Sequence, residues 1–395
     1  MTAESSRRVA AKRTAAMRAE LPLRFLRQQA HLTAPASDLK LAEKAVAGAN
    51  LVAKRLLDRY GLDASAVGEH LGVAAATVEE VLESPAPAIV LDLEDGVPPN
   101  MVEEARANTV RLAAQIDHDR TLCFVRPSSI NDPRCTGDLR TTLLGATTHI
   151  DGVVLPKVRH VHEVEWLHGV LSDIEKEAGL DQNHIRVLYL VETGWGVLNL
   201  PQLATACLDR LAGIILGTVD LAADLLLPEV RFRHPIAEWA RMMMVTVGGA
   251  TGVPAIDGMT IDFPVGRADL NPTQNRAHIL DRMRDNFQDA LHSIDTGMSG
   301  RWVGHPLQLT ATLLAFRSAF AQSSLDEQVA ELEEFSRAMS TRQGAVAGAQ
   351  GQLLDVGTDR HVRQMLRRAT AWGLLPSSQA RELGLISESE MKAAR

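Results

Sequence analysis

The sequence predicts an α/β protein built as a (β/α)₈ barrel, or TIM barrel. Three observations favour this fold: short apolar runs alternate with helical patterns, the runs number eight, and most of them end in charged side chains. Apolar runs without alternation are typical of parallel strands that are buried on both faces. Catalytic side chains of such barrels come from the carboxyl ends of the strands, so a site is expected where the charged residues gather.

The strands follow one another along the chain with helices between them. The first is expected around His31-Leu32-Thr33, and the other seven lie at 88–93, 122–125, 152–155, 187–191, 213–216, 255–261 and 301–303. Helical patterns occupy 102–114, 161–178, 201–210 and 235–246. Regular alternation of strand and helix predicts a parallel sheet, and eight strands favour a closed barrel over an open sheet.

Three segments are expected outside the barrel, which itself spans 31–322. They are an N-terminal helical extension at 1–30, a helical insertion at 47–84, and a helical lid region at 323–395 with a glycine-rich hinge at 344–351. The insertion superficially resembles a DNA-reading helix-turn-helix. Residues 65–83 contain no Lys or Arg, however, so packing against the barrel is the favoured interpretation.

Composition narrows the class of protein. The chain has 395 residues, 46% hydrophobic and 23% charged, with a net charge of −8, which is typical of a globular protein and argues against a nucleic-acid partner. Cys123, Cys135 and Cys207 lack the spacing of a zinc site or a disulfide framework. No apolar stretch reaches the ~20 residues of a membrane helix, and the N-terminus lacks a signal core. We therefore expect a cytoplasmic protein without a membrane partner.

Glu192 and Asp220 are the strongest site candidates, because each is a single carboxylate that ends one of two consecutive runs. Magnesium takes one or two protein carboxylates and fills its other positions with water and substrate oxygens. Manganese is the alternative ion. The competing interpretation is that each carboxylate only caps the helix that follows its strand.

Arg126 ends another run and would face the same end of the barrel. Its guanidinium could hold a substrate carboxylate through two hydrogen bonds, or form an ion pair with Asp92 or Glu94. Both can hold at once, because a carboxylate behind the guanidinium would orient it. We expect Asp92 and Glu94 to support catalysis in this way rather than to bind the metal directly.

An ordered series of motifs resembles the HpcH/HpaI aldolase and citrate lyase family, closest to citrate lyase β-subunits and the malyl-CoA and citramalyl-CoA lyases. The resemblance covers about residues 31–375 without the insertion, and its clearest motif is Asp92-Leu93-Glu94-Asp95-Gly96-Val97. The other matching motifs are Val125-Arg126, Leu155-Pro156-Lys157-Val158, Glu192-Thr193-Gly194-Trp195-Gly196, Leu216-Gly217-Thr218-Val219-Asp220, Ala255-Ile256-Asp257-Gly258, Trp302-Val303-Gly304-His305-Pro306 and Gly351-Gln352-Leu353-Leu354-Asp355.

The resemblance implies roles for particular residues. Glu192 and Asp220 would hold Mg²⁺, and Arg126 would hold the carboxylate of a 2-oxo acid such as glyoxylate or pyruvate. Asp355 would be a lid aspartate that transfers a proton. Lys44 would contact coenzyme A, with Lys40 and Arg24 as nearby alternatives. The remaining positions expected to line the substrate or cofactor site are Pro156, Thr193, Trp195, Gly217, Thr218 and His305.

Three departures from the family pattern indicate an altered pocket. Pro127-Ser128 follow Arg126 where relatives have Asn, Trp195 replaces a small residue, and Thr218-Val219 replace a smaller pair before Asp220. A bulky indole could fill the space that the pantetheine arm of a CoA ester uses, or could stack on another substrate.

Three functions remain open at this point. The first is a lyase or synthase acting on a malyl-CoA- or citramalyl-CoA-like thioester, the second a CoA-independent 2-oxo-acid aldolase, and the third a catalytically silent acyl-binding scaffold. A lid that reaches a neighbouring subunit would suit a homotrimer or homohexamer.

Overall fold

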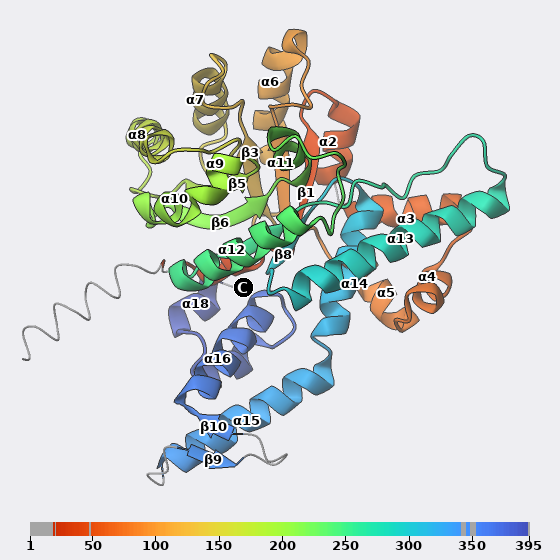
Figure 1. Ribbon diagram of the computed structural model, residues 1–395, viewed down its shortest axis with the longest axis vertical. Coiled ribbons are helices and arrows are strands. Elements are labelled where there is room, and N and C mark those ends of the chain that lie inside the picture. The colour runs from red at the N-terminus through yellow and green to blue at the C-terminus, as the bar shows by residue number, and fades with distance from the viewer. Residues whose placement is uncertain (1–18, 20, 47–48, 341–344, 348–352, 394–395) are drawn as a thin grey trace, which may run out of the picture. The chain divides into compact units, whose positions relative to one another are not determined.

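Eight parallel strands form a closed barrel in the computed structural model, with each strand hydrogen-bonded to the next and β8 returning to β1. The structure describes residues 19, 21–46, 49–340, 345–347 and 353–393. Figure 1 shows helices surrounding the strands. The predicted fold class is therefore confirmed.

The strands nearly coincide with the predicted apolar runs. Their bounds are β1 (Ala30–Pro35), β2 (Ala88–Asp92), β3 (Leu122–Arg126), β4 (Gly152–Leu155), β5 (Arg186–Val191), β6 (Leu211–Leu216), β7 (Ala255–Asp257) and β8 (Gly300–Val303). Asp92 pairs in register with Arg126, so the ends of β2 and β3 lie side by side. The 255–261 run was predicted too long, because Gly258 follows Asp257 and the chain leaves the sheet there.

Helices connect the strands and cover the barrel wall. They are α2 (Leu39–Val46), η2 (Pro99–Met101), α6 (Val102–Ala113), α7 (Cys135–Gly145), α8 (Val161–Ala178), α9 (Gly194–Leu198), α10 (Leu200–Ala206), α11 (Thr218–Asp224), α12 (Pro235–Thr251), α13 (Pro272–Asp295) and α14 (Pro306–Ala319). The helical pattern at 201–210 corresponds to α10, which ends earlier, and the pattern at 235–246 corresponds to the longer α12.

The described part of the 47–84 segment folds as three helices, α3 (Ala49–Arg59), α4 (Ala64–Leu71) and α5 (Ala75–Glu83). These helices contact α13 and the loop that precedes it. His70 lies 3.3 Å from Asp281 of α13, and the Tyr60 hydroxyl accepts a hydrogen bond from the Gly266 amide at 3.1 Å. The contacts fit the interpretation that the segment packs on the protein.

A second compact unit contains residues 22–27 and 316–395. Its described elements are η1 (Leu23–Leu26), α15 (Gln322–Ser340), an antiparallel pair of β9 (Ala345–Ala347) and β10 (Leu353–Asp355), α16 (Val356–Ala371), α17 (Ser377–Glu382) and α18 (Glu388–Ala393). Trp372 packs edge-on against Phe316 and Phe320, and its indole N–H donates to the Leu26 carbonyl.

Two of the predicted segments, the N-terminal extension and the glycine-rich hinge, are described by the structure only in part. Most of the predicted hinge at 344–351, and residues 1–18 and 20 of the predicted N-terminal extension, lie outside the described residues. The β9–β10 pair was not predicted. Among the described helices, none combines the length and the apolar character that crossing a membrane requires.

Candidate functional site

Asp92 and Arg126 form a two-bonded ion pair at the ends of β2 and β3. Arg126 Nε donates to Asp92 Oδ1 at 2.6 Å and Nη2 donates to Oδ2 at 2.8 Å. The guanidinium also lies 5.6 Å from the ring centre of Trp302 on β8. Burial alone would lower the pKa of Arg126, but the charges of Asp92, Glu94 and Glu192 raise it above its usual range. Arg126 is therefore a fixed cation at the carboxyl end of the barrel.

Glu94 stands between two cations. Its Oε1 accepts from Lys157 Nζ at 2.6 Å, and its Oε2 lies 3.2 Å from Arg126 Nη1. That second contact is an ion pair without hydrogen-bond alignment, and no described residue donates a hydrogen bond to the buried Oε2. Burial raises the pKa of Glu94, while Arg126 and Lys157 oppose the shift. A buried oxygen without a donor is ready to accept a hydrogen bond from a ligand.

Lys157 belongs to one of the motifs above but was not among the predicted site residues. It follows β4 with a φ of +53°, a left-handed conformation that costs a non-glycine residue of order 1–3 kcal/mol. Besides Glu94, its ammonium binds Asp95 at 3.0 Å. Burial would lower the pKa of Lys157, but these two carboxylates raise it above its usual range. A permanently charged amine is unsuited to act as a Schiff-base nucleophile.

Glu192 is held by the main chain on two sides. The Lys157 amide donates to Glu192 Oε1 at 2.8 Å. On the other side, a Cβ added at Gly217 would lie 2.5 Å from Glu192 Oε2, so only glycine leaves room for this carboxylate. Glu192 is 2% exposed. Burial and the nearby charge of Asp220 raise the pKa of Glu192 to about 8.

Asp220 lies in the first turn of α11, half-buried, where the free amides at the start of a helix favour negative charge. The structure brings Glu192 and Asp220 near enough for the charge of Asp220 to act on Glu192. The helix-capping alternative does not apply to Glu192, because Thr193 occupies the cap of α9 and accepts from the Gly196 amide at 3.0 Å.

These residues fit a divalent cation. Five carboxylates gather at the ends of β2, β5 and β6 around the cations Arg126 and Lys157; the five are Asp92, Glu94, Asp95, Glu192 and Asp220. Burial and repulsion from Asp220 raise the pKa of Glu192, and a cation between the two carboxylates would offset the repulsion. Within the described ranges no three His, Cys, Asp or Glu side chains form a metal cluster. A metal held by two protein carboxylates would keep positions open for substrate oxygens.

The other predicted binding residues are distributed more widely. Pro156 is buried directly before Lys157, and Thr218 is 8% exposed at the start of α11. Trp195 is 57% exposed on α9, and its ring centre lies 6.1 Å from that of His160. His305 follows β8, and burial lowers its pKa to about 4, so its ring is neutral near pH 7. Lys44 is exposed on α2.

Asp355 belongs to the second unit and begins α16. Its carboxylate accepts from the amides of Gly357 at 2.8 Å and Thr358 at 3.0 Å. These hydrogen bonds lower the pKa of Asp355. The family-implied lid residue is therefore also a helix cap.

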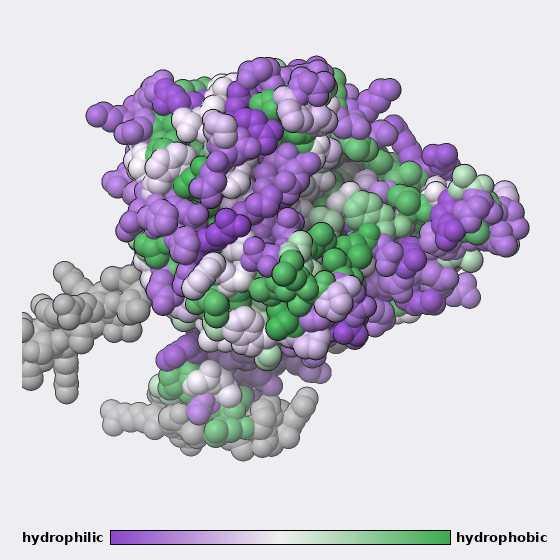
Figure 2. Space-filling view, turned by 45° about the horizontal axis from the view of Figure 1, so that its top comes forward, coloured by the Kyte–Doolittle hydropathy of each residue, from purple (hydrophilic) through white to green (hydrophobic). Residues whose placement is uncertain are grey.

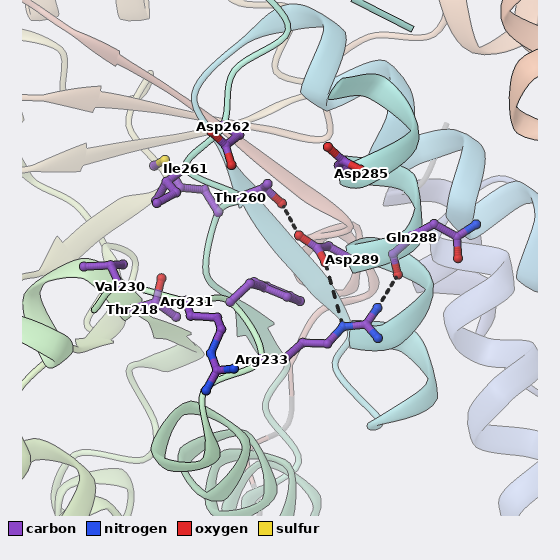
Figure 3. Close-up of a pocket in the computed structure, with 12 residues that line it drawn as sticks. Thr218, Val230, Arg231, Arg233, Thr260, Ile261, Asp262, Asp285, Gln288 and Asp289 are labelled. Atoms are coloured by element: carbon purple, nitrogen blue, oxygen red, sulfur yellow. Dashed lines mark hydrogen bonds and ion pairs between the residues drawn. The ribbon is translucent and has the colours of Figure 1, made fainter. Parts of the chain in front are cut away.

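A cavity of 430 Å³ opens between the loop after β7, the segment before α12, and α13. Figure 3 shows Arg231 and Arg233 on one side of this cavity and Asp262 and Asp285 across from them. Thr218 also lines it, which places the cavity next to the first turn of α11, where Asp220 lies. The cavity was not predicted, because its wall combines residues from the start of α11, the segment before α12, the loop after β7 and α13.

Large apolar side chains are exposed in the loops that follow α11 and β7. They include Leu225 and Leu226 at the end of α11, and Ile261, Phe263 and Val265 after β7. Figure 2 shows hydrophobic areas among mostly hydrophilic ones on the face that it presents. The loops at the carboxyl ends of β6 and β7 therefore offer apolar as well as charged contacts.

Known proteins of similar sequence and fold agree with this architecture. Residues 71–268 match the family model described as HpcH/HpaI aldolase/citrate lyase. The chain is 26% identical over 318 residues to an L-malyl-CoA/beta-methylmalyl-CoA lyase of Rhodobacter capsulatus, covering 75% of this chain and 92% of the relative. It is 27% identical over 292 residues to the human mitochondrial citramalyl-CoA lyase, covering 71% and 78%.

Two solved structures share the fold. A citrate lyase from Burkholderia xenovorans gives a TM-score of 0.62 at 21% identity and covers 93% of this chain and 97% of that one. A Haloferax volcanii malate synthase, solved as a magnesium/glyoxylate complex, gives a TM-score of 0.55 at 17% identity and covers 92% and 97%. The family and the names of the relatives indicate a lyase. The chain belongs to the HpcH/HpaI aldolase/citrate lyase family.

Proposed function

We propose that this protein is a magnesium-dependent carbon–carbon lyase or synthase, with a 2-oxo acid such as glyoxylate or pyruvate as one fragment. Its thioester substrate would resemble malyl-CoA or citramalyl-CoA. The observation that carries the proposal is the buried Glu192 carboxylate, which lies beside Asp220 and within the field of Arg126. A bound 2-oxo acid needs a metal ion, which the two carboxylates would hold, and a cation for its own carboxylate, which Arg126 would supply.

Each residue has a distinct task in the proposed reaction. Glu192 and Asp220 would hold Mg²⁺, or Mn²⁺ in its place, and the bound ion would polarise the carbonyl of the 2-oxo acid and offset the charge that develops on its oxygen. Arg126 would bind the carboxylate of the 2-oxo acid through the guanidinium edge that Asp92 leaves open. Asp92 would keep the guanidinium in place.

In the cleavage direction, the substrate hydroxyl would lose its proton to solvent water, and the carbon–carbon bond would break as the 2-oxo acid carbonyl forms. The electron pair of that bond leaves with the other fragment as an enolate, which then takes up a proton. For cleavage, Asp355 is proposed to take up a proton from solvent and pass it to the enolate, and during synthesis its carboxylate would remove that proton. Its low pKa means that it starts as a carboxylate, which suits removal of a proton in the synthetic direction.

Coenzyme A linkage is supported by the names of the relatives and by the family-implied position of Lys44. The cavity lined by Arg231 and Arg233 is a further candidate for the part of the substrate beyond the reacting carbons. The exposed Trp195 favours the second candidate function, a CoA-independent aldolase, because an indole on the helix that follows Glu192 could stack on a different substrate.

One assay separates these two functions. The purified protein is given Mg²⁺ and glyoxylate together with acetyl-CoA or propionyl-CoA, and in parallel Mg²⁺ with free 4-hydroxy-2-oxo acids. The proposal expects a malyl-CoA-type product by mass spectrometry and its cleavage in the reverse assay. Turnover of the free acids alone would support the aldolase, and no turnover of any substrate would support the silent scaffold.

We also propose assembly as a homotrimer or homohexamer, in which the Asp355 segment serves a neighbouring subunit. Mixing an Asp355→Asn chain with a Glu192→Gln chain tests this arrangement. Recovery of activity in the mixture is expected if the two residues act across subunits, whereas a monomer by light scattering would rule out that arrangement.

A further inference from the structure

We infer that Lys157 is a positioning residue that keeps Arg126 available for the substrate. Its ammonium holds one oxygen of Glu94 and so prevents the Glu94 carboxylate from closing onto the guanidinium. The inference rests on the proposed function, because the group that would occupy the open edge of Arg126 is the carboxylate of the 2-oxo acid.

The geometry of Arg126 defines which edge is open. Asp92 occupies Nε and Nη2 with two short hydrogen bonds of 2.6 and 2.8 Å. Nη1 has Glu94 Oε2 at 3.2 Å without hydrogen-bond alignment. A carboxylate ligand must therefore use the Nη1 side, where Glu94 is its nearest competitor.

Lys157 restrains that competitor. The ammonium binds Glu94 Oε1 at 2.6 Å and Asp95 Oδ2 at 3.0 Å, so two consecutive acids of the β2 loop are tied to one cation. Glu94 is 5% exposed and has no bulk water to turn toward. If the ammonium were removed, Arg126 would be the nearest remaining cation, and a small rotation would complete a charge-assisted hydrogen bond to Nη1.

The left-handed backbone of Lys157 lets one residue contact both Glu94 and the proposed metal ligand Glu192. At a φ of +53° the residue donates its main-chain amide to Glu192 at 2.8 Å while its side chain reaches Glu94. A side-chain substitution removes the contact with Glu94 and leaves the amide bond to Glu192 possible. Binding of the metal and binding of the 2-oxo acid can therefore be separated by changing one side chain.

The test measures binding rather than turnover. Glyoxylate is titrated by calorimetry into the full-length protein at saturating Mg²⁺, and Mg²⁺ is titrated alone, for the wild type, Lys157→Met, Lys157→Met with Glu94→Gln, and Lys176→Met. Lys176 is an exposed lysine on α8 and serves as the matched control for loss of one positive charge. Circular dichroism and thermal unfolding establish that each variant is folded.

Lys157→Met is expected to bind glyoxylate about tenfold more weakly, since one charge-assisted hydrogen bond between Glu94 and Arg126 must be broken first. Its affinity for Mg²⁺ should equal or exceed that of the wild type, because a nearby positive charge is lost. The double variant should regain most of the glyoxylate affinity, because the neutral amide introduced by Glu94→Gln competes weakly for Arg126. Lys176→Met should match the wild type.

Glyoxylate affinity equal to wild type in Lys157→Met, or no recovery in the double variant, would overturn the inference and leave the proposed function standing. A wild-type protein that binds neither Mg²⁺ nor glyoxylate would instead overturn the proposed function, and the inference with it. Should Lys157→Met not fold, Lys157→Gln with and without Glu94→Gln gives the same comparison.

Discussion

Two buried polar clusters of the barrel look alike in sequence and differ in their balance of charge. The first lies at the ends of β2 to β6 and contains Arg126, Lys157 and five carboxylates. The second lies at β7, where Asp257 is bound by Arg241 of α12 at 2.8 Å and by Ser293 of α13 at 2.6 Å. Arg241 also binds Glu238 at 2.9 Å.

In the second cluster the carboxylates of Asp257 and Glu238 are both paired with Arg241 of α12, whereas the first cluster has more carboxylates than cations. Asp257 is wholly buried and each of its oxygens has a donor. Glu192 has a raised pKa, and Glu94 Oε2 has no donor among the described residues. At the ends of the barrel strands, a group of carboxylates that outnumbers its cations therefore indicates a site better than a single paired carboxylate does.

The largest expected effect concerns Glu192. Glu192→Gln should lower steady-state turnover by at least about 10³-fold, because loss of a Lewis acid removes several kcal/mol of stabilisation from the transition state. The unfolding temperature should stay the same or rise near pH 8, because burying a carboxylate with a raised pKa opposes folding. If Glu192→Gln kept turnover within tenfold of the wild type, the first cluster could no longer be distinguished from the second as the functional one.

Arg241→Met should lower the stability of the protein and leave its metal binding unchanged, which is the opposite of the effect expected for Glu192→Gln. Breaking the buried Arg241–Asp257 pair leaves an unpaired carboxylate and should lower the free energy of unfolding by about 3–5 kcal/mol in urea titrations. The affinity for Mg²⁺ should stay close to that of the wild type in the folded variant. If Mg²⁺ binding were lost while stability was kept, the cluster at β7 would be functional rather than structural.

Arg126→Lys tests what the first cluster binds. Lysine keeps the charge but loses the planar fork, so the KM for glyoxylate should rise by about 10- to 100-fold through loss of a charge-assisted contact. Mg²⁺ affinity, measured by calorimetry, should change much less. An unchanged KM for glyoxylate would show that the carboxylate of the 2-oxo acid binds elsewhere.

The smallest effect is the change in Mg²⁺ affinity that one unit of pH causes. Without metal, the folded protein keeps the Glu192 proton up to about pH 8, whereas the unfolded chain releases it near its usual value of 4.5. This group therefore lowers stability as pH rises between those values. Mg²⁺ must displace the proton, so its affinity should rise by at most about tenfold per pH unit up to pH 8 and then level off. A flat profile from pH 6 to 8 would contradict the shifted pKa.

The sequence predicted the barrel well because its strands are buried on both faces and appear as uninterrupted apolar runs. It predicted β7 too long, since Gly258 can end a strand without changing the hydrophobic pattern. The β9–β10 pair was missed because three-residue strands in a glycine-rich segment carry little pattern.

The candidate site was only partly predictable for a physical reason. Glu192 directly follows β5, and Asp220 lies in the first turn of α11 after β6, so the order of the strands alone brings them together. Asp257 has the same position in sequence, and only its pairing with Arg241 on α12 distinguishes it. The main-chain contact between Lys157 and Glu192 depends on a left-handed backbone, which the residue type at position 157 does not predict.

A crystal of the protein soaked with Mn²⁺ and glyoxylate, and measured at the manganese absorption edge, would test the metal proposal without relying on turnover. We predict one anomalous peak in each barrel, with carboxylate oxygens of both Glu192 and Asp220 roughly 2 Å from the ion. A peak bound by other side chains, or carboxylate oxygens of these two residues about 10 Å apart and so beyond the reach of one ion, would contradict it.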